Sequence, residues 1–201
     1  KIESFIQKTN SDNQIQKQVW LKFKIRKKIL KIRKNRNKNN CYIKFEHIYH
    51  LLKKTSNLRK KIIGGYYPVN YEIDDLNILR KLEKKKISIS LPSIKKNFKM
   101  SFIKCSLNDP LVINKYGIPE PSTGKIVHPD ILLVPLVAFD KNLNRLGYGA
   151  GYYDRLIESL KKKKKIITIG LAFDFQEFNS IPTSKYDQKL DYIVTNKNIL
   201  K

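Results

Sequence analysis

The stretch from residue 140 to residue 155, DKNLNRLGYGAGYYDR, carries the residue types best suited to chemistry. Three glycines at alternating positions, Gly147, Gly149 and Gly151, lie between an apolar run and a pattern typical of an amphipathic helix. Glycine permits positive φ and lets backbone N–H groups approach a ligand closely, and a helix N-terminus adds unpaired N–H groups and a positive dipole end. Such a segment is also compatible with a tight turn, but its position between a strand and a helix favours an anion-binding loop for phosphate.

Polar and aromatic side chains accompany these glycines. Asp154 falls in the first turn of the expected helix, where a carboxylate either compensates the helix dipole or holds a magnesium ion beside phosphates. Tyr148, Tyr152 and Tyr153 could stack on a flat heterocycle, or one of them could pack in the core. The segment thus predicts both a nucleotide phosphate site and a neighbouring aromatic wall.

The elements that must position this loop alternate between helix and strand. Residues 16–34 place Leu21, Ile25, Ile29 and Ile32 on one apolar stripe, which predicts a helix. The run from 130 to 139 is apolar almost throughout, as expected of a strand covered on both faces. Further helices are predicted over residues 42–54, 74–84 and 152–164, and further strands over residues 61–69, 87–91 (stopped by Pro92), 99–105, 165–173 and 192–195.

This alternation predicts a single-domain, layered α/β fold with a largely parallel central sheet flanked by helices. We expect residues 1–15 to form a loose N-terminal extension and residues 16–201 to form one catalytic α/β domain. Cys41 and Cys105 lie far apart and outside any CxxC pair, so a zinc site or a disulfide framework is not expected.

The chain is strongly basic, with a formal net charge of +25 over 201 residues. Such a charge attracts anionic partners, but lysine, asparagine and isoleucine are enriched together, which indicates a compositional bias that fills exposed positions. The sequence contains no apolar run long enough to span a membrane. Residues 1–18 also lack the apolar middle of a secretory signal. We expect a cytoplasmic location.

Several short motifs together resemble the 5-formyltetrahydrofolate cyclo-ligase family, also called methenyltetrahydrofolate synthetase. RLGYGAGYYDR, preceded by DILLVPLVAFD, is similar to the family signature. The motifs GGYYPVNYEID, LP, MSF, EP, IGLAFDFQ and IP, with a spaced aspartate pair, follow in family order, and the match spans residues 18–195. The resemblance implies a fold of the NagB/RpiA/CoA-transferase-like type.

The resemblance also implies an ATP site. In the family, a basic N-terminal helix and the glycine loop bind ATP. Helical geometry separately puts Lys22, Arg26 and Arg33 on one cationic edge. Ala150 stands where some family members have lysine, so the backbone amides and Arg145 are expected to meet the phosphates. The implied ATP-binding residues are Lys22, Arg26, Arg145, Leu146, Gly147, Tyr148, Gly149, Ala150, Gly151, Tyr152 and Tyr153.

Metal and folate positions follow from the same resemblance. The magnesium carboxylates fall on Asp154 and Asp187, with Asp191 as an alternative to Asp187. The folate-binding positions fall on Tyr67 and Glu72, with Tyr148 and Tyr152 forming the wall shared by the two substrates. A carboxylate can accept from pterin N–H groups, and an aromatic ring can stack on the pterin. No side chain is assigned as a nucleophile.

The implied activity is ATP-dependent cyclisation of 5-formyltetrahydrofolate to 5,10-methenyltetrahydrofolate, with ADP and phosphate as the other products. Mg²⁺ is the implied cofactor, and phosphoryl transfer mainly requires positioning and charge neutralisation. We expect a monomer with no obligate protein partner, no membrane association and no nucleic-acid ligand. Two alternatives remain at this point: a basic nucleic-acid-binding protein, and a fold relative that has lost activity.

Overall fold

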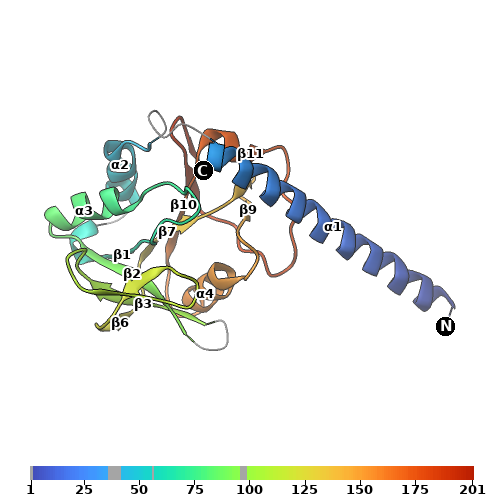
Figure 1. The fold of residues 1–201 in the computed structure, drawn as a ribbon, viewed down its shortest axis with the longest axis horizontal. Coiled ribbons are helices and arrows are strands. Elements are labelled where there is room, and N and C mark those ends of the chain that lie inside the picture. The colour runs from blue at the N-terminus through green and yellow to red at the C-terminus, as the bar shows by residue number, and fades with distance from the viewer. Residues whose placement is uncertain (1, 36–41, 56, 96–98) are drawn as a thin grey trace.

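The structure is a computed structural model that describes residues 2–35, 42–55, 57–95 and 99–201, with side chains described from residue 13 onward. An eight-stranded sheet forms the centre of the molecule (Figure 1). Its strand order is β13-β12-β10-β7-β1-β2-β3-β6. The bounds of its strands are β1 Ile62–Gly64, β2 Ser88–Ile94, β3 Met100–Cys105, β6 Ile126–Val127, β7 Ile131–Pro135, β10 Ile167–Leu171, β12 Tyr192–Val194 and β13 Ile199–Leu200.

The sheet is parallel in its middle and antiparallel at its edges. The pairs β12–β10, β10–β7, β7–β1 and β1–β2 are parallel, whereas β13, β3 and β6 pair antiparallel to their neighbours. The predicted layered α/β fold with a largely parallel central sheet is therefore confirmed. Parallel strands point their carboxyl ends to one edge, where the following loops can build a site.

Helices cover both faces of this sheet. Helices α2 (Phe45–Thr55) and α3 (Leu76–Lys84) pack on one face, and α4 (Tyr152–Lys161) packs on the other (Figure 1). The central strand β7 serves both layers, because Ile131 and Leu133 join the core beneath α2 and α3 while Leu132 and Val134 join the core beneath α4. Successive side chains of a strand point to opposite faces of the sheet. Because both faces of β7 are covered, every position of this strand is apolar.

Helix α1 (Ile2–Asn35) is longer than the sequence predicted. Residues 2–15, expected as a loose extension, continue the helix, and this part projects from the domain (Figure 1). The residues there are mostly compatible with helix and contain neither glycine nor proline to stop it. The predicted apolar stripe packs as expected, with Ile29 buried and Ile25 and Ile32 partly buried against the small sheet.

Several predicted strands have different bounds in the structure. β1 ends at Gly64 rather than near residue 69, because the backbone leaves the sheet there: Gly65 N still donates to Ser90 O at 3.0 Å, but Tyr66 N donates to the Asp75 side chain at 2.8 Å. β2 continues through Pro92, which is tolerated because the register of β2 with β1 ends at Ser90, so Pro92 is paired with β3 alone.

The long strand predicted over residues 130–139 is divided in two. β7 ends at Pro135, and β8 (Ala138–Asp140) belongs to a separate sheet with β9 (Arg145–Leu146) and β11 (Glu177–Phe178). Proline lacks the N–H that would continue the ladder, and the chain leaves the large sheet there. A further hairpin pairs β4 (Leu111–Ile113) with β5 (Pro119–Pro121), and short 3₁₀ turns span Leu58–Lys60 and Asp174–Gln176.

Candidate active site

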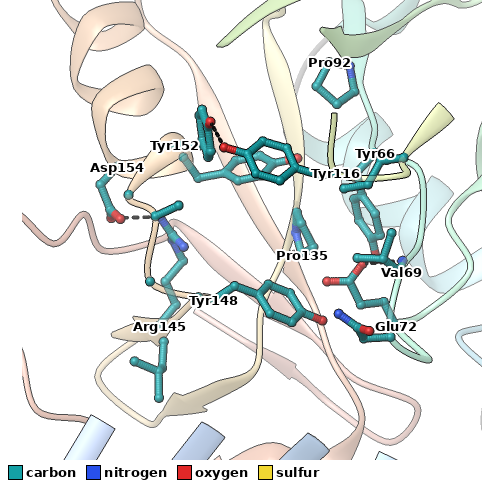
Figure 2. A pocket seen from close by; sticks show the side chains of 18 of the residues that line it. Tyr66, Val69, Glu72, Pro92, Tyr116, Pro135, Arg145, Tyr148, Tyr152 and Asp154 are labelled. Carbon is teal, nitrogen blue, oxygen red and sulfur yellow. Dashed lines mark hydrogen bonds and ion pairs between the residues drawn. The ribbon is translucent and has the colours of Figure 1, made fainter. Parts of the chain in front are cut away.

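A cavity of about 860 Å³ lies at the carboxyl ends of the central strands. Pro135 at the end of β7, Tyr66 after β1 and Pro92 in β2 form part of its wall (Figure 2). Every residue assigned to a site from the sequence lines it: Lys22, Arg26, Tyr67, Glu72, the segment Arg145–Tyr153, Asp154 and Asp187. Segments far apart in the sequence therefore meet at one cavity.

The glycine loop connects β9 to α4 along one side of the cavity. Gly149 and Gly151 have φ of 111° and 67°, which a residue with a side chain rarely adopts. Gly151 is the N-cap of α4, so the first backbone N–H groups of the helix are available beside the loop. The geometry of an anion-binding loop before a helix N-terminus is present.

Two cations from α1 reach this loop. Arg26 Nε donates to Gly147 O at 2.8 Å, and its guanidinium lies 3.4 Å from where a Cβ on Gly149 would stand. Partial burial lowers the pKa of Arg26, and Asp187 opposes that effect. Lys22 Nζ pairs with Asp187 Oδ2 at 2.7 Å. The basic helix thus supplies positive charge beside the glycine loop.

Arg33, the third member of the predicted cationic edge, does not line this cavity. It is 4% exposed and reaches Tyr148 from the opposite side, with Nη1 donating to Tyr148 Oη at 3.0 Å. Arg145 is also buried, and its guanidinium pairs with Asp154 Oδ1 at 2.7 Å. Arg145 therefore holds the Asp154 carboxylate at the start of α4 (Figure 2).

Asp154 and Asp187 line the cavity together, whereas Asp191 braces the sheet by accepting from Thr168 N and Oγ1 at 2.8 Å. Burial alone would raise the pKa of Asp187, but hydrogen bonds from Lys22 and the Ser184 backbone outweigh it, so its pKa is lowered. It is ionised at neutral pH.

These carboxylates suit Mg²⁺ in one specific way. Among the described residues, no three His, Cys, Asp or Glu side chains form a metal site by themselves. Asp154 and Asp187 supply two carboxylates on one cavity wall, and Mg²⁺ is commonly bound by one or two carboxylates together with phosphate oxygens and water. The donor set therefore fits an ion that arrives with a polyphosphate.

The loop after β1 forms the opposite wall and presents Glu72. Its fold depends on Asp75, whose Oδ2 accepts from Tyr66 N at 2.8 Å. Glu72 Oε2 accepts from Val69 N at 2.9 Å, while its buried Oε1 has no hydrogen-bond partner in the described chain. Burial raises the pKa of Glu72 to about 7, against hydrogen bonding from Val69 and attraction from Arg33. An unpaired carboxylate oxygen facing a cavity is suited to a ligand with N–H donors.

Tyrosines close the top and side of the cavity. Tyr116, at the tip of the β4–β5 hairpin, is hydrogen-bonded through its hydroxyl to Tyr152 Oη at 2.8 Å, and the two rings meet edge to face (Figure 2). The Tyr148 ring extends across the cavity toward Glu72 (Figure 2). Tyr116 and Tyr66 were not assigned from the sequence, and Arg33 was placed only on the cationic edge, because their roles depend on contacts between distant segments.

The remaining assigned residues differ in how much they offer a ligand. Tyr67 lines the cavity and is partly exposed, whereas Leu146 is 2% exposed and its side chain belongs to the core beneath α1. Ala150 is exposed, and its carbonyl accepts from Arg155. At Leu146 and Ala150 the backbone is therefore the part available to a ligand.

Fold and site together are those of an α/β protein in which a glycine loop, basic side chains and two carboxylates face an aromatic pocket, an arrangement typical of an enzyme. A model of the 5-formyltetrahydrofolate cyclo-ligase family matches residues 19–196. The chain belongs to this family, which confirms that it is to be read as an enzyme.

Relatives agree with this assignment. A 5-formyltetrahydrofolate cyclo-ligase of Haemophilus influenzae is 33% identical over 70% of this chain and 79% of its own length. One of Mycoplasma genitalium is 37% identical over 68% of this chain and 73% of its own length. The solved structure of 5,10-methenyltetrahydrofolate synthetase from Aquifex aeolicus has a TM-score of 0.73 and 32% identity, covering 90% of this chain and 92% of that one.

Proposed function

We propose that this chain closes the ring of 5-formyltetrahydrofolate to give 5,10-methenyltetrahydrofolate, with ATP converted to ADP and phosphate. The observation that carries the proposal is the convergence on one cavity of a glycine loop, basic side chains, two carboxylates and a buried unpaired glutamate oxygen. The ligase relatives named above support the same substrate.

The phosphates of ATP fit the glycine-loop side. Backbone N–H groups of residues 147–153 and the positive end of α4 favour an anion there, and Arg26 and Lys22 add charge. Mg²⁺ held by Asp154 and Asp187 would neutralise phosphate charge during transfer. Since Arg145 already holds Asp154, its role is to orient that carboxylate.

The folate fits the opposite side. Glu72 Oε1 would accept from N–H groups of the pterin, and Tyr67, Tyr148 and Tyr152 would stack on or border the flat rings. This arrangement directs the formyl group at nitrogen 5 toward the γ-phosphate.

The reaction then proceeds in two steps. The formyl oxygen attacks the γ-phosphorus, the bond to the ADP oxygen breaks, and the formyl carbon becomes a phosphorylated iminium centre. Nitrogen 10 attacks that carbon and loses its proton, and the C–O bond breaks to release phosphate. The protein contributes positioning and electrostatic stabilisation, and no side-chain nucleophile is needed.

Absorbance at the methenyl-folate band tests the proposal. Protein mixed with 5-formyltetrahydrofolate, ATP and Mg²⁺ should give a rise that requires ATP and is lost in Asp154→Ala. Folded wild-type protein that gives no rise would identify a fold relative without activity. We further propose a cytoplasmic monomer that acts without a protein partner.

A further inference from the structure

Arg33 is a buried cation that neither the glycine loop nor the metal carboxylates account for. It lies in the last turn of α1 and is 4% exposed. A guanidinium removed from water must be paired or hydrogen-bonded to be stable. What Arg33 contacts therefore indicates what it does.

The contacts of Arg33 lead to the folate side of the cavity. Nη1 donates to Tyr148 Oη at 3.0 Å, and Nη2 donates to the carbonyl of Leu136 just after β7. The same carbonyl accepts from Gln176 Nε2 at 3.0 Å, so the acceptor is itself fixed in place. Arg33 thus ties the Tyr148 ring to the end of the central strand.

Glu72 is the carboxylate that the positive charge of Arg33 attracts. Arg33 attracts the Glu72 carboxylate and so lowers its pKa, and the nearby Tyr148 hydroxyl acts in the same direction. Figure 2 shows the Tyr148 ring directed across the cavity toward Glu72. Glu72 also borders a second cavity of about 940 Å³, and Arg33 lines that second cavity too, so the two residues share a cavity on the side away from the glycine loop.

We propose that Arg33 is a positioning residue for folate binding, which holds Tyr148 against the pterin pocket and places a positive charge near the Glu72 carboxylate that accepts from the pterin. This inference rests on the proposed function, because it concerns the substrate assigned to Glu72. Under this proposal the basic residues of α1 have two roles: Lys22 and Arg26 lie at the phosphate side of the cavity, and Arg33 positions the residues that bind the folate.

The neighbours of Glu72 determine in which direction its pKa should move when Arg33 is replaced. Burial raises its pKa to about 7 and Arg33 lowers it, so loss of the guanidinium should raise it further. Burial raises the pKa of the neighbouring Asp75 well above its ordinary value, and the Glu72 carboxylate adds to that rise. The groups facing Glu72 are Arg33 from α1, Tyr66 and Asp75 from its own loop, Tyr148 from the glycine loop and Tyr153 from α4.

Arg33→Met and Arg33→Lys separate the two roles. In Arg33→Met we expect the acidic limb of kcat/KM for folate to move up by about one pH unit, and KM for folate to rise about tenfold through loss of a charged hydrogen bond. Arg33→Lys retains the charge but not the two-point fork, so the acidic limb stays and KM for folate rises. KM for ATP stays at its wild-type value in both, and Lys31→Met, at an exposed position of α1, is the matched control.

A titration without substrate distinguishes this inference from the proposed function. Carboxyl carbon-13 NMR on glutamate-labelled protein, with Glu72→Gln to assign the signal, reads the pKa of Glu72 directly. An upward shift in Arg33→Met and none in Lys31→Met supports the electrostatic part even if wild-type protein shows no activity. A Glu72 pKa and a KM for folate unchanged from Lys31→Met would overturn the proposal. If Arg33→Met does not fold, Arg33→Lys decides it: an unchanged KM for folate overturns it.

Discussion

Replacing Arg26 with methionine should weaken ATP binding about tenfold to a hundredfold while leaving KM for folate unchanged. Arg26 Nε donates to Gly147 O at 2.8 Å and is half-buried against the loop. A hydrogen bond from a charged group contributes about 1.5–3 kcal/mol, and each 1.4 kcal/mol is about tenfold in affinity. The loss should fall on ATP, because Arg26 contacts the loop that we assign to the phosphates.

The assay measures KM for ATP at saturating folate, with the rate read from the absorbance of the methenyl product. Calorimetric titration with Mg·ADP measures binding separately. Lys27→Met is the control, since it removes a charge from an exposed position of the same helix. The fold should survive, because Ile29 and the Lys22–Asp187 pair still attach α1 to the domain. If Arg26→Met binds Mg·ADP as tightly as Lys27→Met, the assignment of the phosphates to this loop is refuted.

Three further changes test other parts of the account. The pKa of Glu72 is about 7 in the folded protein against an ordinary 4.5, so the native state binds this proton more tightly and the wild-type protein loses stability as pH rises from 4.5 to 7. Glu72→Gln should remove this pH dependence, and thermal melts across that range should show a flatter profile in the variant. Tyr116→Phe removes the exposed hydroxyl bonded to Tyr152 and should raise KM for folate by about fivefold at most, measured in initial-rate assays. Gly65→Ala puts a Cβ 2.4 Å from Leu79 and should lower the unfolding free energy by about 1–3 kcal/mol in urea titrations.

Local patterns were sufficient to predict much of the fold. The stripe containing Ile29 predicted the packing of α1, and the alternating sides of β7 follow from its apolar run. The same patterns failed where packing or pairing decided the outcome. Pro92 remains in a strand because β2 is not paired with β1 at that point, and β1 ends early because Tyr66 N donates to the Asp75 side chain instead of a neighbouring strand.

Some residues of the site could also be predicted from local sequence, whereas others could not. Gly149 and Gly151 could be predicted because positive φ before a helix is a local property of the chain. The Tyr116–Tyr152 hydrogen bond and the Arg33–Tyr148 contact join residues separated by 36 and 115 positions, so spacing along the sequence does not reveal them. The family resemblance indicated which residues would contact ATP, metal or folate, but it assigned no role to Arg33.

The most direct test of the chemistry follows the formyl oxygen. 5-Formyltetrahydrofolate labelled with oxygen-18 in the formyl group would be turned over with unlabelled ATP, and the released phosphate analysed by mass spectrometry. Attack of the formyl oxygen on the γ-phosphorus predicts one labelled oxygen in each phosphate released. Methenyl product formed with unlabelled phosphate would contradict phosphoryl activation of the formyl group.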